Sequence, residues 1–357
     1  MMNTTTNAIM DIEEPALDDQ EELFERLTIV TDKGQEPYRI DKFLMNRIEG
    51  ATRNKIQQAI EAGRVLVNEK PIKSNYKIRG GDKIVVYESR LPESTEIIPQ
   101  EIPINIIYED DDVLIINKAA GMVVHPGSGN RDGTLVNAVA WHLQLKDPTI
   151  NEGSLSRFGL VHRIDKNTTG LLVMAKGQKA MNNLAKQFYE HTVYRRYIAL
   201  VWGDVVQDEG TIHTNVGRSL RLRKIFTTYP DGDHGKEAIT HYKVLERFNY
   251  VTLVECRLET GRTHQIRVHM QSIGHPLFND DFYGGDRIVK GTVFTKYKQF
   301  VENCFTICAR QALHAGELGF IHPNTNKEIK FTCELPDDMK NVIEKWRKYA
   351  VNKNLID

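Results

Sequence analysis

The chain has 357 residues, of which 40% are hydrophobic, and it carries a formal net charge of −1 at pH 7. This length predicts two domains plus a tail, and the apolar fraction is sufficient for a packed core. Its apolar runs are shorter than the ~20 residues of a membrane-spanning helix, and its polar, acidic start is unlike a signal peptide, so we expect a soluble, cytoplasmic protein that contacts no membrane.

The near-neutral net charge hides a strong asymmetry along the chain. Residues 1–25 contain eight acidic side chains and no Lys or Arg, which leaves a formal charge of +7 on the remainder. We expect residues 1–27 to form a solvated, disordered tail, although an acidic segment can also mimic a polyanion. The folded remainder is therefore expected to be basic.

The first predicted domain is a compact basic module at 28–92. A short amphipathic helix begins near Arg39. A second helix begins after Thr52, a residue type that favours the N-cap, and ends at Gly63. Basic side chains on these elements suit a phosphate-binding face, and the alternative is a charged surface that keeps the domain soluble. The candidate phosphate-binding residues are Arg53, Lys55 and Arg64.

A second, larger body is predicted after a linker. Residues 93–105 contain two prolines and several glutamates, which indicates the linker, and the body extends over 106–350. Its strand patterns are not separated by regular helical crossovers, so we predict an α+β fold with a mixed, largely antiparallel sheet. The expected strands include 113–117, 123–127, 196–202, 240–245 and 250–258, and the expected helices are 134–143, 180–188, 265–273 and 336–349.

The four cysteines do not have the spacing of a metal site. They are Cys256, Cys304, Cys308 and Cys333, and no two of them form a Cys-x-x-Cys pair. Cys304 and Cys308 are four residues apart in a mixed sequence, which is more typical of buried thiols than of a zinc site.

The most informative segment contains an Arg-x-Asp pair. Arg163 and Asp165 follow His162 between two apolar runs, and a turn-prone Asn-Thr-Thr-Gly comes after them. A charged pair between apolar strands is costly to bury without a partner or a function. Taken alone, the pair is typical of a structural ion pair on a loop, whereas the other motifs of the chain favour a functional carboxylate.

Two further segments place polar side chains in apolar surroundings. Tyr197 lies in a predicted strand, where a tyrosine is usually part of the core. Arg262 precedes a predicted helix, where the helix dipole disfavours a cation, so we expect it to have an anionic partner. His264 and His269 are five residues apart and do not share one helical face. We therefore expect no metal site there.

A basic loop is predicted within the larger body, at 217–224. One interpretation is that this loop has no binding function and is a flexible, charged connector. Contact with phosphate is favoured if the partner is a polyanion, and the candidate residues are then Arg221 and Arg223.

The basic module resembles a known family, the S-four RNA-binding module of a small-subunit ribosomal protein and of several RNA-modifying enzymes. The resemblance covers nearly the whole module and implies that its helical face binds structured RNA. The matching segments are 39–44, the helix at 53–63, Gly63-Arg64-Val65-x-Val67-Asn68 and Gly81-Asp82.

The larger body resembles the RluA/RluD family of RNA pseudouridine synthases from about Ile106 to Gly319. Several long motifs occur in the family's order, which is very improbable by chance. Ala119 departs from the family's usual proline, and Phe278-Asn279 replaces its usual Val-Gly, which affects only loops. The matching motifs are Gly-Leu-Val-His-Arg-Ile-Asp-Lys-x-Thr-Thr-Gly-Leu-Leu at 159–172, Tyr-x-Ala-Leu-Val-x-Gly at 197–203 and Thr-Gly-Arg-Thr-His-Gln-Ile-Arg-Val-His at 260–269, with shorter ones at 108–118, 121–127, 274–277 and 283–285.

This resemblance implies that the protein isomerises uridine in RNA to pseudouridine. The bond between the ribose and the uracil nitrogen breaks, and the base rotates and rejoins through C5. Because the reaction has no net redox change, we expect no cofactor and no metal. The branch that the chain resembles most acts on large-subunit ribosomal RNA, so we expect ribosomal RNA as the partner of a monomeric enzyme.

The resemblance also implies a role for each candidate residue. Asp165 would attack the anomeric carbon or take up a ribose proton, and both alternatives stay open. Tyr197 would stack under the flipped uracil and could remove the C5 proton. Arg262 would be the salt-bridge partner of Asp165. Arg163 would fill the space that the base leaves. The remaining substrate-binding candidates are His162, Leu258 and Ile266.

Two other functions remain as alternatives. A non-catalytic RNA-binding or ribosome-assembly protein could keep the same scaffold, but it should have lost part of the site, whereas Asp165, Tyr197 and Arg262 are all present. A hydrolase with an acid pair would generally need two carboxylates, and the central motif offers one carboxylate and a cation.

Overall fold

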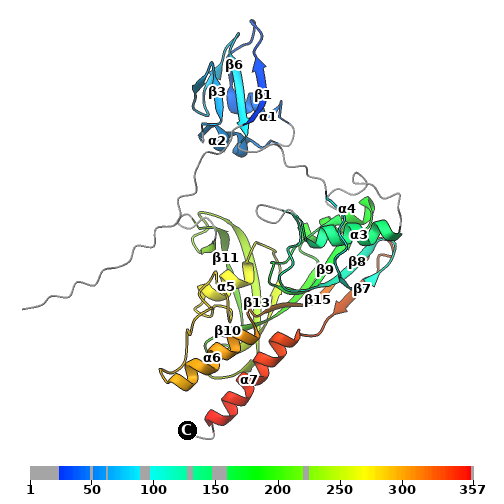
Figure 1. Ribbon diagram of the computed structural model, residues 1–357, viewed down its shortest axis with the longest axis vertical. Coiled ribbons are helices and arrows are strands. Elements are labelled where there is room, and N and C mark those ends of the chain that lie inside the picture. The colour runs from blue at the N-terminus through cyan, green and yellow to red at the C-terminus, as the bar shows by residue number, and fades with distance from the viewer. Residues whose placement is uncertain are drawn as a thin grey trace, which may run out of the picture. The chain divides into compact units, whose positions relative to one another are not determined.

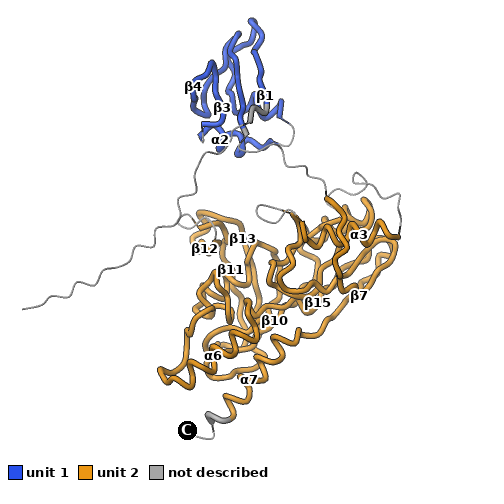
Figure 2. The backbone as a smooth tube through the Cα atoms, viewed as in Figure 1, with its two compact units in different colours: residues 1–95 blue, residues 96–357 orange. Residues whose placement is uncertain are grey.

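The computed structural model describes residues 24–48, 51–61, 63–88, 97–126, 132–146, 159–219 and 225–354. The chain divides into two compact units, residues 1–95 and residues 96–357 (Figure 2). Each unit has its own hydrophobic core.

The first unit is a small sheet with two short helices (Figure 1). Its four-stranded sheet has the order β1-β6-β3-β4 and is antiparallel throughout, and β2 pairs with β5 separately. The elements are β1 (Phe24–Val30), β2 (Tyr38–Arg39), α1 (Ile40–Met45), α2 (Arg53–Glu61), β3 (Val65–Val67), β4 (Lys70–Pro71), β5 (Lys77–Ile78) and β6 (Lys83–Glu88).

The local signals at both ends of α2 act as the sequence predicts. The hydroxyl of Thr52 accepts a hydrogen bond from the backbone N–H of Lys55 at 3.4 Å, which is the N-cap geometry. Gly63 follows the helix with φ of 70°, a conformation that glycine adopts without a steric penalty. The stripe of Ile56 and Ile60 packs into the core of the unit.

The boundaries of the first unit differ from the predicted ones. Strand β1 begins at Phe24, inside the segment predicted to be a disordered tail, because Leu27 and Ile29 pack on the core while the strand pairs with β6. Residues 1–23 of that tail lie outside the described residues. The predicted linker at 93–105 is also partly structured, since Ile97 is 7% exposed and belongs to the core of the second unit.

The second unit is built on a ten-stranded sheet in the order β12-β11-β13-β14-β10-β15-β9-β8-β7, with β16 paired to β15. Among the described strands every pairing is antiparallel except that of β15 with β9, so the predicted mixed, largely antiparallel α+β sheet is confirmed. The strands are β7 (Asn105–Glu109), β8 (Val113–Lys118), β9 (Thr169–Ala175), β10 (Tyr194–Trp202), β11 (Glu209–Arg218), β12 (Phe226–Tyr229), β13 (Lys236–Arg247), β14 (Val251–Leu258), β15 (Leu313–Ile321) and β16 (Glu328–Thr332).

Strand β10 is the central element of this sheet and is buried on both faces. Side chains alternate along a strand, and here both sets are apolar. Tyr197 and Ala199 belong to the core on one face, whereas Ile198, Leu200 and Trp202 belong to the core on the other. The pattern of apolar residues on both faces predicts this central position correctly.

Helices cover both faces of the sheet (Figure 1). On the face of Tyr197 they are α3 and α5, which share a core with alternate residues of β8, β9 and β10. The opposite face packs against α4 at one end and against α6 and α7 at the other. The helices are α3 (Leu135–Lys146), α4 (Gln178–Tyr189), α5 (Gln265–Ser272), α6 (Thr295–Ile307) and α7 (Asp337–Asn354).

The strand predicted at 123–127 is wrong for the described residues 123–126. The backbone carbonyls of Val123 and Val124 accept hydrogen bonds from Leu135 and Val136, the first residues of α3, at 2.8 and 3.1 Å. The segment therefore supplies acceptors to the amino end of a helix, which has free N–H groups, and does not pair with a strand.

Cys304 and Cys308 are buried, as the sequence predicts. Cys256, Cys304 and Cys308 are buried free thiols, and burial raises the pKa of each to about 12. No helix among the described residues combines the length and the hydropathy needed to cross a bilayer.

Candidate active site

A pocket of about 340 Å³ opens beside the sheet of the second unit. Its walls come from the loop before β9, from the first half of β10, from the end of β14 and from α5. The structure brings together every candidate residue that the sequence places in this unit outside the basic loop. These residues are His162, Arg163, Asp165, Tyr197, Leu258, Arg262 and Ile266.

Asp165 lies in a short loop whose backbone is held at three points. The carbonyl of Asp165 accepts a hydrogen bond from the N–H of Thr168 at 3.1 Å, which closes a turn. The next two carbonyls, of Lys166 and Asn167, accept from the side chains of Lys118 and Arg310 at 2.8 and 3.0 Å. The loop is thus fixed by backbone contacts, and the carboxylate of Asp165 is left 20% exposed at the pocket.

Lys118, at the end of β8, is a buried cation that uses all three of its donors on carbonyls. Its side chain is 1% exposed, and Nζ donates to the carbonyls of Ala119, Met122 and Lys166 at 2.7, 3.0 and 2.8 Å. Burial lowers the pKa of Lys118 to about 7, and the charge of Arg310 acts in the same direction. Its position ties the end of β8 to the Asp165 loop.

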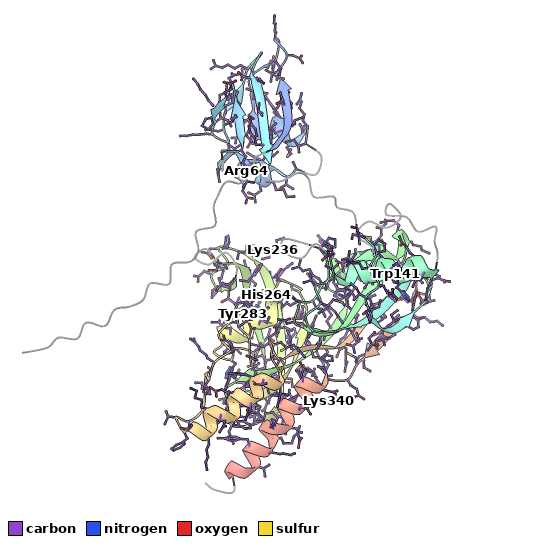
Figure 3. The ribbon with its side chains drawn as sticks, viewed as in Figure 1. Arg64, Trp141, Lys236, His264, Tyr283 and Lys340 are labelled. Atoms are coloured by element: carbon purple, nitrogen blue, oxygen red, sulfur yellow. The ribbon has the colours of Figure 1, made fainter. Side chains whose placement is uncertain are left out.

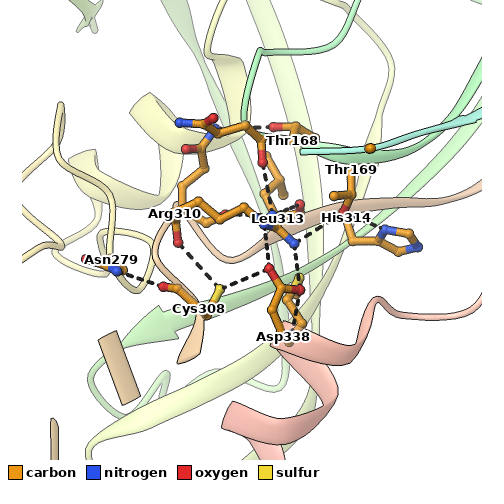
Figure 4. A network of polar contacts seen from close by, with 12 residues as sticks. Thr168, Thr169, Asn279, Cys308, Arg310, Leu313, His314 and Asp338 are labelled. Atoms are coloured by element: carbon orange, nitrogen blue, oxygen red, sulfur yellow. Dashed lines mark hydrogen bonds and ion pairs between the residues drawn. The ribbon is translucent and has the colours of Figure 1, made fainter. Parts of the chain in front are cut away.

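Arg310 performs the same task from the opposite side and links the loop to the C-terminal helix (Figure 4). Its Nη1 donates to three carbonyls, those of Asn167, Gln311 and Leu313. Its Nε and Nη2 form a bidentate pair with Asp338 at the start of α7, at 2.7 and 3.0 Å. A residue in the first turn of a helix more than 170 positions away therefore helps to position the loop of Asp165.

The carboxylate of Asp165 is paired with Arg267, on α5. Nη1 of Arg267 donates to Oδ2 of Asp165 at 3.1 Å. The other edge of the same guanidinium forms a bidentate pair with Asp280, with distances of 2.7 and 2.8 Å, and Asp280 is fully buried. Burial acts to lower the pKa of Arg267, but the hydrogen bonds and charges of Asp280 and Asp165 outweigh it and raise the pKa above its ordinary value. One permanent cation therefore serves two carboxylates.

The predicted ion pair between Arg262 and Asp165 is wrong. Nε of Arg262 donates to the carbonyl of Glu237 on β13 at 2.8 Å, while its backbone N–H donates to the side chain of Gln265 at 2.9 Å. These contacts direct the guanidinium toward the sheet, although Arg262 still lines the pocket. The sequence feature that could have identified Arg267 as the partner is its position inside a helix. An arginine among buried neighbours requires an acidic partner.

Tyr197 projects from β10 into the pocket and is 8% exposed. Burial raises the pKa of Tyr197, and the charge of Asp165 acts in the same direction, against a lowering effect of Arg195. The hydroxyl is therefore a neutral phenol in the structure at neutral pH. Its ring shares an apolar cluster with Ile266 and Leu258, which line the same pocket.

Arg195 is a pocket residue that the sequence analysis did not single out. It is two positions before Tyr197, and residues two apart on a strand share a face. The side chain is 7% exposed, Nη2 donates to the carbonyl of Glu259 at 2.9 Å, and Nε has no hydrogen-bond partner. Burial lowers the pKa of Arg195, the charge of Arg262 acts in the same direction, and the acceptors of Nη2 are the backbone carbonyls of Leu258 and Glu259. A buried cation of this kind suits an anionic ligand.

His162 lines the pocket, but its ring is used to support the fold. Nε2 accepts a hydrogen bond from the backbone N–H of Val173 on β9 at 3.0 Å, and the ring stacks on Phe188 with centroids 4.4 Å apart. Burial lowers the pKa of His162 to about 3, so the ring is neutral. Its neighbour Arg163 is exposed at the pocket rim.

The remaining candidates lie elsewhere. Arg221 and Arg223 fall outside the described residues, between β11 and β12. In the first unit Arg53 and Lys55 are exposed and Arg64 is partly buried. Figure 3 labels Arg64 on this unit. Nε of Arg53 also donates to the buried Asp41 at 3.0 Å, so part of this guanidinium is bound within the module.

One cluster has the composition of a metal site, but its hydrogen bonds argue against that use. Asp110, Asp112 and His322 bring ligand atoms within 4.8 Å of one another. Nδ1 of His322 accepts from the backbone N–H groups of Asn324 and Thr325, at 3.3 and 3.2 Å, so its proton is on Nε2, which faces Asp110 at 2.9 Å. Both ring nitrogens are thus occupied by protein contacts.

Two family models match the chain. Residues 112–272 match the model described as RNA pseudouridylate synthase, and residues 39–84 match the S4 domain. The first match contains Asp165, Tyr197 and Arg267. The second lies within the first unit and confirms the resemblance of the basic module.

Relatives of high identity span nearly the whole chain. An uncharacterized RNA pseudouridine synthase of Chlorobaculum parvum is 47% identical over 322 residues, which cover 90% of this chain and 98% of that protein. The ribosomal large subunit pseudouridine synthase D of Zymomonas mobilis is 41% identical over 305 residues, which cover 85% of this chain and 92% of that protein.

A solved structure, human RNA pseudouridylate synthase domain containing 4, shares the fold with a TM-score of 0.53 at 22% identity, over 68% of this chain and 93% of that one. The predicted fold is confirmed by this likeness. Together with the relatives above, these matches show that the protein belongs to the family of RNA pseudouridine synthases, enzymes that isomerise uridine in RNA to pseudouridine.

Proposed function

We propose that this enzyme modifies uridines of large-subunit ribosomal RNA, with Asp165 as the group that acts on the nucleotide. The observation that carries the assignment of Asp165 is its environment. It is the one carboxylate among the residues that line the described pocket, and Arg267 binds it. The choice of RNA is supported by relatives named as ribosomal large subunit pseudouridine synthase D, which match this chain over most of its length.

The pocket offers a division of roles for the reaction. The target uridine must leave its stack to reach Asp165. In this proposal the ring of Tyr197 stacks under the uracil, and Leu258 and Ile266, which line the same pocket, are the apolar walls. Arg267 pairs with the carboxylate of Asp165 and orients it. Arg163, which is exposed and lines the pocket, is proposed to occupy the space that the base leaves.

The RNA outside the pocket would contact basic groups of both units. Arg195 and Arg262 line the pocket and suit the phosphates beside the target uridine. Arg53, Lys55 and Arg64 belong to the S4 domain, and Arg221 and Arg223 to the basic loop. We infer that these groups provide most of the affinity for RNA, whereas the pocket provides the chemistry.

The enzyme is proposed to act as a cytoplasmic monomer without a metal. The isomerisation has no net redox change. The cation that pairs with the carboxylate of Asp165 is the side chain of Arg267, so the proposed reaction uses no metal ion at this carboxylate. The proposal keeps an N-terminal tail at 1–27 and a linker at 93–105, of which Phe24 onward belongs to strand β1 and Ile97 packs in the core of the second unit.

The first prediction concerns Asp165. In Asp165→Asn the side chain keeps its size but loses its charge, so release of tritium from RNA labelled at C5 of uridine should fall by on the order of a thousandfold or more. The label measures the reaction because C5 loses its hydrogen when it bonds to the ribose. Asp111→Asn, at an exposed turn, is the matched control and should keep the wild-type rate. Equal release from the wild type and Asp165→Asn would refute the assignment.

The second prediction separates the two arginines. Arg267→Lys keeps the charge but cannot bind Asp280 at two points and Asp165 at the same time, so the single-turnover rate at saturating RNA should fall at least about tenfold. Arg262→Lys leaves the Asp165 pair intact and should stay within about threefold of the wild type. Thermal unfolding of both variants checks that they fold. A larger loss of rate in Arg262→Lys than in Arg267→Lys would restore the original sequence prediction.

The third prediction concerns the RNA. Deletion of the gene should remove at least one pseudouridine from large-subunit ribosomal RNA, as mapped by sequencing or mass spectrometry. Expression of the wild-type protein should restore the modification, and expression of Asp165→Asn should not, because the substituted protein still binds RNA but lacks the carboxylate. An unchanged map of ribosomal RNA, with losses in another class of RNA, would exclude the ribosomal assignment.

A further inference from the structure

His264 stands beside Asp165 in a conformation that few side chains adopt. Its φ is 57° and its ψ is 21°, in the left-handed region, at the residue just before α5. Non-glycine residues in this region are uncommon, and histidine is among the few types enriched there. Such backbone strain persists where the surroundings fix the residue in place. Here the ring is packed edge-on against Phe226, Phe282 and Tyr283, with centroids 5.7 to 5.9 Å away.

A hydrogen-bond chain determines which nitrogen of His264 carries the proton. The hydroxyl of Tyr283 lies 2.8 Å from Nδ1 of His264, and it accepts the backbone N–H of Phe226, on β12, at 3.2 Å. Figure 3 shows His264 and Tyr283 side by side next to α5. Tyr283 is 8% exposed, so its own proton needs an acceptor. Nδ1 is the acceptor at hand, and the proton of a neutral His264 is therefore on Nε2.

The protonated nitrogen faces the carboxylate. Nε2 of His264 is 3.8 Å from Oδ1 of Asp165, while Arg267 binds Oδ2 at 3.1 Å. The opposite tautomer would direct a lone pair at the carboxylate, so both ends of the ring favour the same assignment. The 3.8 Å separation is longer than a hydrogen bond, and catalytic hydrogen bonds of this kind often shorten only when substrate is bound.

The ring is neutral in this environment. Burial lowers the pKa of His264, and the charges of Arg267 and Arg163 lower it further, against Asp165 and Asp280, which raise it. A neutral ring can donate one hydrogen bond in a fixed direction without adding a second positive charge beside Asp165. Arg267 thus supplies the positive charge that pairs with Asp165, and His264 supplies a hydrogen-bond donor of fixed direction.

We propose that His264 is a positioning residue for Asp165, which orients the carboxylate by donating from Nε2 to Oδ1 in a tautomer that Tyr283 fixes. This inference rests on the proposed role of Asp165. It also connects the site to the hairpin of β11 and β12, because the N–H of Phe226, close to the basic loop, begins the hydrogen-bond chain.

Two substitutions at one position separate positioning from folding. Asparagine tolerates the left-handed conformation and keeps a polar group near the place of Nδ1, but it cannot reach Asp165. Glutamine is long enough to place an amide N–H near the position of Nε2. His264→Asn should lower the single-turnover rate of tritium release by roughly tenfold to a hundredfold, the usual range for a lost hydrogen bond to a charged group, with the Kd for RNA within twofold. His264→Gln should recover to within about threefold of the wild type.

A spectroscopic measurement tests the tautomer independently of activity. In protein labelled with ¹⁵N-histidine, the signals that disappear in His264→Asn should have the shifts of a neutral ring with a protonated Nε2 and an unprotonated Nδ1. In Tyr283→Phe, which removes the hydroxyl, the ¹⁵N shifts of His264 should move away from those of a ring protonated only on Nε2. A protonated Nδ1 in the wild type would overturn the inference even if a glutamine variant failed to fold.

The kinetic outcomes distinguish this inference from the function on which it rests. An inactive Asp165→Asn together with a fully active His264→Asn would overturn the role of His264 alone. Equal losses of rate in folded His264→Asn and His264→Gln would overturn it too, because they would indicate a structural role. An active Asp165→Asn would instead refute the proposed function.

Discussion

The active site depends on one guanidinium that lies between two carboxylates. Arg267 binds the fully buried Asp280 at two points and Asp165 at one. Separating the partners of a buried ion pair is strongly destabilising. The pair with Asp280 therefore persists without RNA and fixes the plane of the Arg267 guanidinium. The remaining N–H then has a set direction, and Asp165 receives a cation that cannot lose its proton. The two carboxylates differ in exposure, and only Asp165 reaches the pocket.

The rest of the second unit holds the backbone of Asp165 against this cation. Lys118 and Arg310 each bind one carbonyl of the loop, and Arg310 is in turn bound by Asp338 on α7. Such contacts with carbonyls restrain the loop without neutralising its carboxylate. Strand β10, buried on both faces, brings Tyr197 to the same pocket from the centre of the sheet. The groups proposed to be catalytic therefore come from segments that are far apart in the sequence but rigidly placed.

The sequence contained much of this arrangement, and its omissions have physical reasons. Asp165 and Tyr197 could be found because each lies in a local motif on or beside a strand. Arg262 was predicted to be the partner of Asp165 from its position before a helix. Arg262 and Arg267 belong to the same motif, and an argument from the helix dipole does not specify the direction in which either side chain points. Lys118 and Arg310 act through backbone carbonyls, and a contact between Arg310 and Asn167 across 143 positions leaves no trace in a local pattern. The packing of Ile97 on the second unit was missed for the same reason.

The most direct test of this account is a single-turnover measurement of tritium release by Asp280→Asn at saturating RNA. Asp280 is fully buried and does not itself line the pocket, but it binds Arg267, which does. The substitution removes the charge of Asp280 while keeping its shape. If Arg267 is oriented by Asp280, the rate should fall at least about tenfold, the Kd for RNA should be unchanged, and Asp281→Asn at the exposed neighbouring position should behave like the wild type. A folded Asp280→Asn enzyme with the wild-type rate would contradict the account.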